Sequence, residues 1–250
     1  MKQLSKTQRL VAIAVLSFLL WELAALVVRS NSFPHSWSVL GNFASLITEV
    51  SFWKDLTLTL WISLLGFLIG TASALAIGIC IGLSRDAELA SRATLNFVRV
   101  IPSVVMLPLL IASIGSSART AVILSAFVVT FTFVTYVVRG IADTEKQLIE
   151  ASKLMQLPRM VQVLFLYLPS TVSLLGTGMR LCASRAFGTV VAAGIVAGTP
   201  GLGSRLYLAQ ANADTNRVFS YVFVMGITGV LIYSSFTIVE KRLFKWKVSV

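Results

Sequence analysis

Apolar blocks of about 20 residues recur along this chain, with only short polar joints between them. A block of this length crosses a hydrocarbon core about 30 Å thick as one helix, because a helix satisfies its own backbone hydrogen bonds. Charged residues make up 12% of the 250 residues, about half the share of a soluble domain. The pattern predicts an all-α polytopic membrane protein with one membrane domain over residues 1–250, which leaves no room for a soluble catalytic domain.

Six blocks are expected to span the bilayer, and the core spans cover about residues 56–239. A charged joint, residues 84–99, precedes the third block, in which Pro102 and Pro108 predict a bent or broken helix. The fifth apolar run is too long for a single crossing, so we expect a bend at Pro169. The expected spans are residues 10–28, 56–83, 101–115, 121–138, the later two-thirds of 163–198, and 218–239.

Small residues recur in the second block at a spacing that lets two helices approach closely. We expect this block to pack tightly against a partner helix. The small residues concerned are Gly66, Gly70, Gly78 and Gly82.

In a membrane protein, an excess of Lys and Arg indicates which segments face the cytoplasm, so the net charge of +11 does not predict a nucleic-acid partner. With the N-terminus inside, fourteen Lys and Arg residues face inward and five face outward. The remaining two, Arg180 and Arg185, lie within the spans. The positive-inside rule therefore predicts that residues 1–9, 143–158 and 240–250 are cytoplasmic.

The cytoplasmic segment 143–158 is expected to form a short amphipathic helix. Thr144 and Gln147 have the spacing of a capping box, so the helix should begin near Glu145. Pro158 is expected to end the helix because it lacks an amide donor. Outside the bilayer, an apolar helix face needs a partner surface, either lipid headgroups or another protein. The residues of this face are Leu148, Ala151 and Met155.

The same stretch resembles the E-A-A…G…I-x-L-P loop of the membrane subunits of bacterial ABC importers. Glu150-Ala151-Ser152 match its start, Leu168-Pro169 match its end, and Gln156 stands where the pattern has Gly. The resemblance covers most of the chain, and the whole pattern is similar to that of the permeases of the nitrate, sulfonate and taurine branch. Other matching segments are Pro102 to Pro108, Gly140 to Glu150, Gly178-Met179-Arg180, Pro200 to Gly203, and Glu240-Lys241-Arg242-Leu243 followed by Trp246.

This resemblance implies a type I ABC importer (MetI-like) permease fold in the bacterial inner membrane. It implies as partners a second copy of the chain, two ABC ATPase subunits, an extracytoplasmic substrate-binding protein and the lipid bilayer. It also implies that the short helix docks into the ATPase, whereas the alternative is a membrane-surface helix with no ATPase partner. The implied coupling residues are Glu150, Ala151, Ser152, Lys153, Met155, Gln156, Leu157 and Pro158.

Energy for transport is expected to come from outside this chain. No Lys directly follows a Gly, so a Walker A phosphate loop is absent. The resemblance implies that ATP and magnesium bind to the partner ATPase, and that this transport subunit is not an enzyme and holds no cofactor or metal. His35 is expected to be a solvated loop residue, and Cys80 and Cys182 to be free thiols in apolar blocks.

Substrate-pathway candidates lie inside the predicted spans. A charge at the bilayer centre costs about 3 kcal/mol, so Arg180 and Arg185 must face a cavity, a counter-charge or an interface. Arg180 matches an Arg common in the family. Arg185 could present a hydrogen-bonding surface to an anionic sulfonate, carboxylate or nitrate. The alternative is that Arg185 pairs with Glu22 or caps backbone carbonyls. The further candidates are Ser184, Thr189, Thr132, Thr135 and Tyr136.

The leading hypothesis is the permease subunit of an ATP-driven importer for a small anion that a binding protein delivers. A self-sufficient secondary transporter or channel is the alternative, and it would need ion-handling carboxylates, of which Glu22 alone lies in a predicted span. A third possibility, an intramembrane enzyme, would need a paired nucleophile and base within the spans, and the only histidine, His35, lies outside the predicted spans. The family pattern does not assign the solute, because Gly194 stands where many relatives carry Glu, and Ile62 where many carry Arg.

Overall fold

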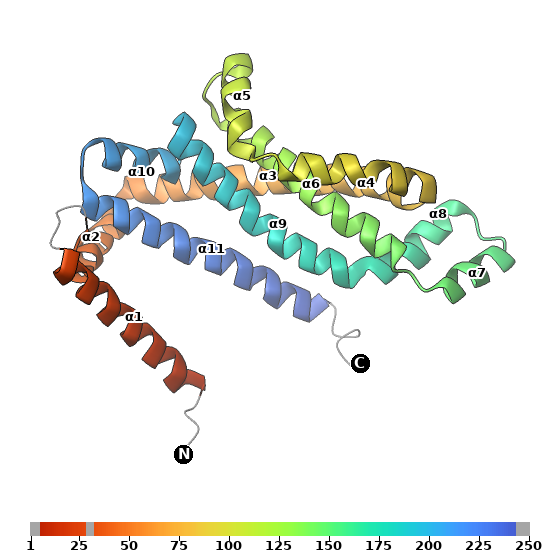
Figure 1. The fold of residues 1–250 in the computed structure, drawn as a ribbon, viewed down its shortest axis with the longest axis horizontal. Coiled ribbons are helices and arrows are strands. Elements are labelled where there is room, and N and C mark those ends of the chain that lie inside the picture. The colour runs from red at the N-terminus through yellow and green to blue at the C-terminus, as the bar shows by residue number, and fades with distance from the viewer. Residues whose placement is uncertain (1–5, 29–32, 244–250) are drawn as a thin grey trace.

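The computed structural model describes residues 6–28 and 33–243, and over these ranges the chain is a bundle of α-helices (Figure 1). Parts of the predicted cytoplasmic ends, residues 1–5 and 244–250, and the predicted outer residue Arg29 lie outside this description. The helices are α1 (Lys6–Val28), α2 (Ser36–Thr48), α3 (Val50–Gly82), α4 (Arg85–Val100), α5 (Leu107–Ile114), α6 (Ala118–Ala142), α7 (Lys146–Leu154), α8 (Arg159–Gln162), α9 (Leu168–Ala197), α10 (Leu202–Ala211) and α11 (Thr215–Leu243).

Three long helices form the centre of the bundle. Helix α3 packs along α6, α6 packs along α9, and α11 contacts α9. Buried side chains from the three central helices meet in one apolar core, which includes Ala74, Val129, Phe133 and Cys182. A second core joins α2, α10 and the start of α11 at one end of the bundle.

Helices cover most of the six predicted spans, but within the described ranges fewer than six stretches are long and apolar enough to cross a bilayer. Among the described residues, four helical stretches are long and apolar enough to cross a bilayer, or five if a bent pair is one span. The predicted first span lies in α1, which is apolar over Val15–Val28. The four stretches are Val50–Gly82, Ala118–Ala142, Arg159–Ala211 and Thr215–Glu240, and the bent pair is Arg85–Val100 with Ser103–Ile114.

The predicted charged joint at residues 84–99 is helix α4. Its first turn holds two carboxylates, Asp86 and Glu88, which stabilise the positive end of the helix dipole. The Ser84 hydroxyl accepts a hydrogen bond from the Ala87 amide at 3.4 Å and caps the helix. The prediction of a charged joint named no secondary structure, and the charged residues occupy one face of an amphipathic helix.

The predicted break near Pro102 is confirmed. Ile101, which precedes the proline, is extended, as expected from the steric conflict between a proline ring and a helical neighbour. The chain then continues through a 3-10 turn, Ser103–Met106, into α5, and the two helical parts are bent by 83°. The third predicted span is therefore the second arm of a broken helix.

The expected bend at Pro169 lies one turn earlier. Residues Val163–Tyr167 form a π-helical turn in which the Leu168 amide donates to the Val163 carbonyl. Pro169 lies in the first turn of α9, where its missing amide hydrogen is tolerated. Figure 1 shows the chain change direction between α8 and α9 at this turn.

The glycines of α3 pack against α6, as predicted. A Cβ atom on Gly66 would lie 2.5 Å from the Ser125 hydroxyl oxygen, and one on Gly78 would lie 2.6 Å from Val137 Cβ. Gly70 and Gly82 meet Val129 and Ile141 at similar distances. Only glycine allows the two backbones to come this close, so these positions set the distance between α3 and α6.

We predict that Gly70→Ala lowers the melting temperature of the purified protein, with a loss of about 1–3 kcal/mol. The new methyl group would lie 2.6 Å from Val129 Cβ and 2.7 Å from the Ala126 carbonyl oxygen. Gly229→Ala on α11 is the matched control, because nothing lies within 4 Å of its Cβ position. Equal melting temperatures for the two variants would contradict this packing.

Candidate functional site

Helix α7 begins where the sequence predicted, but without the predicted cap. The N-cap residue is Glu145, and no side chain caps the helix. Thr144 is buried, and its hydroxyl oxygen has no hydrogen-bond partner. The capping box with Gln147 is therefore wrong, because Thr144 packs inward instead of turning toward the first-turn amides.

The end of α7 differs from the prediction that Pro158 stops the helix. The helix ends at Leu154, and Gln156 adopts a left-handed conformation with φ of 52°. The Gln156 amide donates to the Lys153 carbonyl at 3.0 Å, and the Leu157 amide donates to the Ser152 carbonyl at 3.1 Å. These two bonds define a Schellman motif, whose left-handed position favours glycine. Pro158 instead precedes the next helix, α8.

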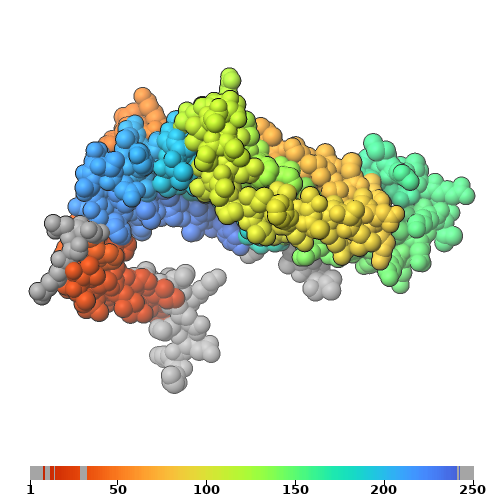
Figure 2. All heavy atoms as spheres, turned by 45° about the horizontal axis from the view of Figure 1, so that its top comes forward, coloured from red at the N-terminus to blue at the C-terminus, as the bar shows by residue number. Residues whose placement is uncertain are grey.

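Most of the predicted coupling residues are solvent-exposed at the tip of the molecule. Helices α7 and α8 project from one end of the bundle (Figures 1 and 2). Leu154 and Met155 are 85% and 71% exposed, which is unusual for apolar side chains beside a packed helix. Ser152 is buried and donates to the Ile149 carbonyl at 2.7 Å, and Leu157 is half-buried. The exposed coupling residues are Glu150, Ala151, Lys153, Met155, Gln156 and Pro158.

A cavity of about 430 Å³ lies where the broken helix meets α6 and α9. Arg185 lies near the middle of α9 and Thr132 near the middle of α6, and the Arg185 Nη1 donates to Thr132 Oγ1 at 3.1 Å. The cavity thus brings together three of the predicted pathway residues, Arg185, Thr132 and Thr189. The lining residues are Val98, Arg99, Val100, Ile101, Pro102, Ser103, Phe127, Val128, Phe131, Thr132, Arg185, Gly188, Thr189 and Ala192.

The alternative that Arg185 pairs with Glu22 is wrong. The Glu22 carboxylate lies at the start of α2, where it accepts from the Ser36 amide at 3.1 Å and contacts His35 Nδ1 at 2.8 Å. His35 is an exposed loop residue, as predicted, and in addition contacts Glu22 of α1. Glu22 serves to join α1 to α2.

The other pathway candidates lie outside this cavity. Arg180 pairs with Glu240 at 3.1 Å, and its guanidinium lies 5.0 Å from the Tyr233 ring centroid, so it joins α9 to α11. Ser184 donates to the Arg180 carbonyl at 3.4 Å, and Thr135 donates to the Thr132 carbonyl at 2.8 Å. The Tyr136 ring packs against Gly178, so close that a Cβ atom on this glycine would overlap the ring.

Sequence reasoning missed Arg99 as a cavity residue. It was assigned to the cytoplasmic joint because it ends a charged stretch. In the structure Arg99 lies in the last turn of α4 and lines the same cavity as Arg185. The available signal was its position three residues before Pro102, since irregular backbone within a membrane domain lines a cavity or is buried in protein.

At the end of the bundle opposite α7 and α8, the Gly-rich loop at residues 199–204 is anchored to α3. The Thr59 hydroxyl accepts from the Leu202 amide at 2.9 Å and donates to the Asp55 carbonyl at 2.7 Å. Gly201 has φ of 132°, and a Cβ there would lie 2.5 Å from Thr59 Oγ1. The turn at Gly201 therefore also serves as a contact with α3.

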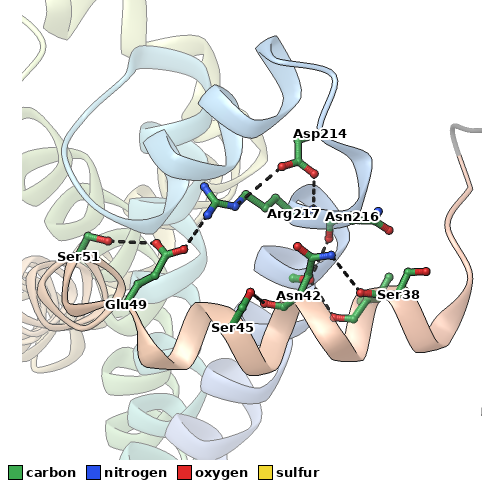
Figure 3. A network of polar contacts seen from close by, with 10 residues as sticks. Ser38, Asn42, Ser45, Glu49, Ser51, Asp214, Asn216 and Arg217 are labelled. Atoms are coloured by element: carbon green, nitrogen blue, oxygen red, sulfur yellow. Dashed lines mark hydrogen bonds and ion pairs between the residues drawn. The ribbon is translucent and has the colours of Figure 1, made fainter.

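Ion pairs bind the elements of this same end together. Figure 3 shows Arg217 between two carboxylates, with its Nη2 at 2.6 Å from Glu49 and its Nε at 3.9 Å from Asp214. Arg205 on α10 lies 2.6 Å from Asp55 on α3. These pairs connect α10 and α11 to the junction of α2 and α3.

The broken helix, the cavity between long apolar helices and the exposed helix at one end define a multi-pass membrane permease. The family model for the binding-protein-dependent transport system inner membrane component matches residues 66–245, and the chain belongs to this family. The resemblance to ABC importer permeases is therefore confirmed.

Individual relatives agree with this assignment. The putative aliphatic sulfonates transport permease SsuC of Bacillus subtilis is 26% identical and aligns over 89% of this chain and 81% of its own length. The taurine transport system permease TauC of Escherichia coli is 23% identical over 94% of this chain and 87% of its own length. A chain of the MetNI methionine ABC transporter superimposes with a TM-score of 0.68 at 19% identity, and covers 77% of this chain and 95% of that chain. The type I importer fold is confirmed.

We predict that Gln156→Gly stabilises the coupling segment by about 1 kcal/mol, because glycine adopts the left-handed conformation without a steric penalty. Amide hydrogen exchange at residues 152–157 should slow. Gln147→Gly, the same change in the first turn of α7, is the control and should speed exchange, since glycine lowers helix propensity. Faster exchange in both variants would contradict the Schellman geometry.

We predict that Thr59→Val destabilises the protein by about 1–3 kcal/mol, because the buried Leu202 amide would lose its acceptor. The measurement is the melting temperature of the purified protein. Thr57→Val is the matched control, because its hydroxyl only donates to the Trp53 carbonyl of its own helix. A fall in melting temperature that is the same for both variants would refute the anchoring role.

Proposed function

We propose that this chain is the permease subunit of an ATP-driven importer for small oxyanions, of the sulfonate, taurine, nitrate or carboxylate type. The observation that carries the proposal is Arg185, which lines the cavity without a carboxylate beside it. A guanidinium binds a sulfonate or carboxylate through parallel hydrogen bonds. Thr132 and Thr189 add hydroxyl groups that donate to the same oxygens.

The names of the relatives support the substrate class. One is a permease for aliphatic sulfonates and another a permease for taurine, and both substrates carry a sulfonate group. The cavity of about 430 Å³ lies in the range of small-molecule sites. In this proposal, a binding protein delivers the anion to the end of the bundle that holds the loop 199–204 and the Arg217 ion pairs.

The exposed end with α7 is proposed to contact a cytoplasmic ATPase. Leu154 and Met155 expose an apolar surface there, bordered by Glu150 and Lys153, and such a surface needs a partner. The complex would contain two permease copies and two ATPase subunits, and ATP and magnesium would bind to the ATPases. Both termini would be cytoplasmic, in line with the positive-inside rule. A membrane-surface helix without an ATPase is the competing interpretation of α7.

Co-purification tests this assembly. The permease, expressed with its chromosomal neighbours and extracted in mild detergent, should retain an ATPase, and Met155→Glu should release it by placing a charge in the apolar contact. If no ATPase co-purifies and reconstituted uptake continues without ATP, a self-sufficient transporter or channel replaces this proposal.

We predict that Arg185→Gln raises the half-maximal concentration of the transported anion by about tenfold or more, because a charge-assisted bond contributes about 1.5–3 kcal/mol. The measurement is anion-stimulated ATP hydrolysis by the reconstituted complex with its binding protein, with ethanesulfonate, taurine and nitrate as probes. Arg92→Gln is the control, because Arg92 pairs with Glu88 on the exposed face of α4. An unchanged half-maximal concentration in Arg185→Gln would remove the ligand role.

A further inference from the structure

The cavity holds two guanidinium groups and no carboxylate. Arg99 and Arg185 both line it, and none of its lining residues is Asp or Glu. Four arginines of α4, α9, α10 and α11 are paired with acids: Arg92 with Glu88, Arg180 with Glu240, Arg205 with Asp55, and Arg217 with Glu49. Within the described part of the chain, Arg99 makes no hydrogen bond or ion pair, and the bond of Arg185 to Thr132 is to a neutral hydroxyl.

Two like charges that line one cavity repel each other, and both side chains are exposed and therefore accessible to a ligand. Arg185 lies near the middle of α9, far from either end of that helix. Charged side chains at such depth require a water-filled cavity or an opposite charge. None of the lining residues is an acid, so an anionic ligand would supply the opposite charge.

The two arginines come from different elements, on either side of the cavity wall. Arg99 ends α4, immediately before the 83° break at Pro102, whereas Arg185 belongs to the central helix α9. The Ser103 hydroxyl lies on the cavity wall just after the break. An anion held by both guanidiniums would therefore bridge the broken helix and the core of the bundle.

Apart from Ser103, Thr132 and Thr189, the rest of the wall is apolar, and part of it is aromatic. Phe127 and Phe131, on consecutive turns of α6, have ring centroids 4.7 Å apart and line the cavity together with Val128. A purely inorganic anion would leave this surface unused. An organic anion with a short aliphatic tail would place its charged head at the arginines and its tail against the two rings.

We propose that Arg99 and Arg185 form a two-guanidinium site for the head of a soluble organic oxyanion, with Phe127 and Phe131 receiving its aliphatic tail. This inference rests on the proposed function in that the anion is the transported solute. It adds a second arginine, a preference for alkyl-bearing over inorganic oxyanions, and a role for the broken helix in holding the substrate.

The test places a single reactive thiol in the cavity. Ser103→Cys is introduced into a background with Cys80→Ser and Cys182→Ala, and the full permease–ATPase complex is reconstituted in phosphatidylcholine nanodiscs. Cysteine modification rates are measured with anionic sulfonatoethyl methanethiosulfonate and with cationic trimethylammonioethyl methanethiosulfonate. The ratio of the two rates reports the electrostatic potential beside Ser103 and needs neither transport nor ATP.

Arg99→Gln and Arg185→Gln should each lower the anion-to-cation rate ratio by about fivefold. Arg92→Gln, two turns away on α4 and paired with Glu88, is the control and should leave the ratio within about twofold of the parent. Arg99→Lys keeps the charge and should keep the ratio. An unchanged ratio in Arg99→Gln overturns the two-arginine site, even if Arg185→Gln behaves as proposed.

A second experiment tests the proposed contact of the ligand's aliphatic tail, by measuring how well alkanesulfonates protect the cysteine from modification. Butanesulfonate should protect Cys at position 103 at lower concentrations than methanesulfonate, by about three- to fourfold per added methylene, and Phe131→Ala should reduce this dependence on chain length. Equal protection by methanesulfonate, butanesulfonate and nitrate overturns the organic preference. Loss of protection when phosphatidylglycerol is added to the nanodiscs would assign the site to a lipid phosphate and overturn a soluble ligand.

These outcomes separate this inference from the proposed function. A rate ratio that depends on both arginines, with protection by alkanesulfonates but no ATP-driven uptake, would retain the site and reject the importer. ATP-driven uptake with an unchanged ratio in Arg99→Gln would retain the importer and reject the two-arginine site.

Discussion

The rest of the structure depends on the close contact of α3 with α6. In hydrocarbon there is no hydrophobic gain from joining two apolar helices, so the attraction comes from van der Waals contact between surfaces that fit closely. Gly66, Gly70 and Gly78 remove the side chains that would hold the backbones apart. Helix α6 in turn packs along α9, so this contact also sets the relative position of Thr132 and Arg185.

Interruptions of regular helix are placed where the membrane domain can tolerate them. The break at Pro102 borders a cavity, and the π-helical turn before Pro169 lies beside the exposed coupling segment. The first interruption changes the direction of the chain at Pro102, and the second does so at the π-helical turn one turn before Pro169. The first creates the wall that carries Arg99, and the second turns the chain from α8 into the core.

Sequence reasoning succeeded where the physical cause is local. The break at Pro102 follows from the geometry of a proline ring, and the family pattern of glycine at position 156 agrees with its left-handed backbone. It failed where several local solutions compete. Thr144 could cap α7 or pack inward, and burial against the bundle decided for packing. The arginines and carboxylates of residues 84–99 suited a loop or an amphipathic helix equally well.

By itself, the sequence determined that this chain is a multi-pass membrane protein, because apolar length acts on each segment separately. Its resemblance to ABC importer permeases then indicated the family. Only the tertiary structure decided which charges meet. Glu22 pairs with His35 and Arg180 with Glu240, while Arg99 and Arg185 share a cavity without an acid. The reason is that pairing depends on distances of a few ångström between helices far apart in the chain, and packing alone sets those distances.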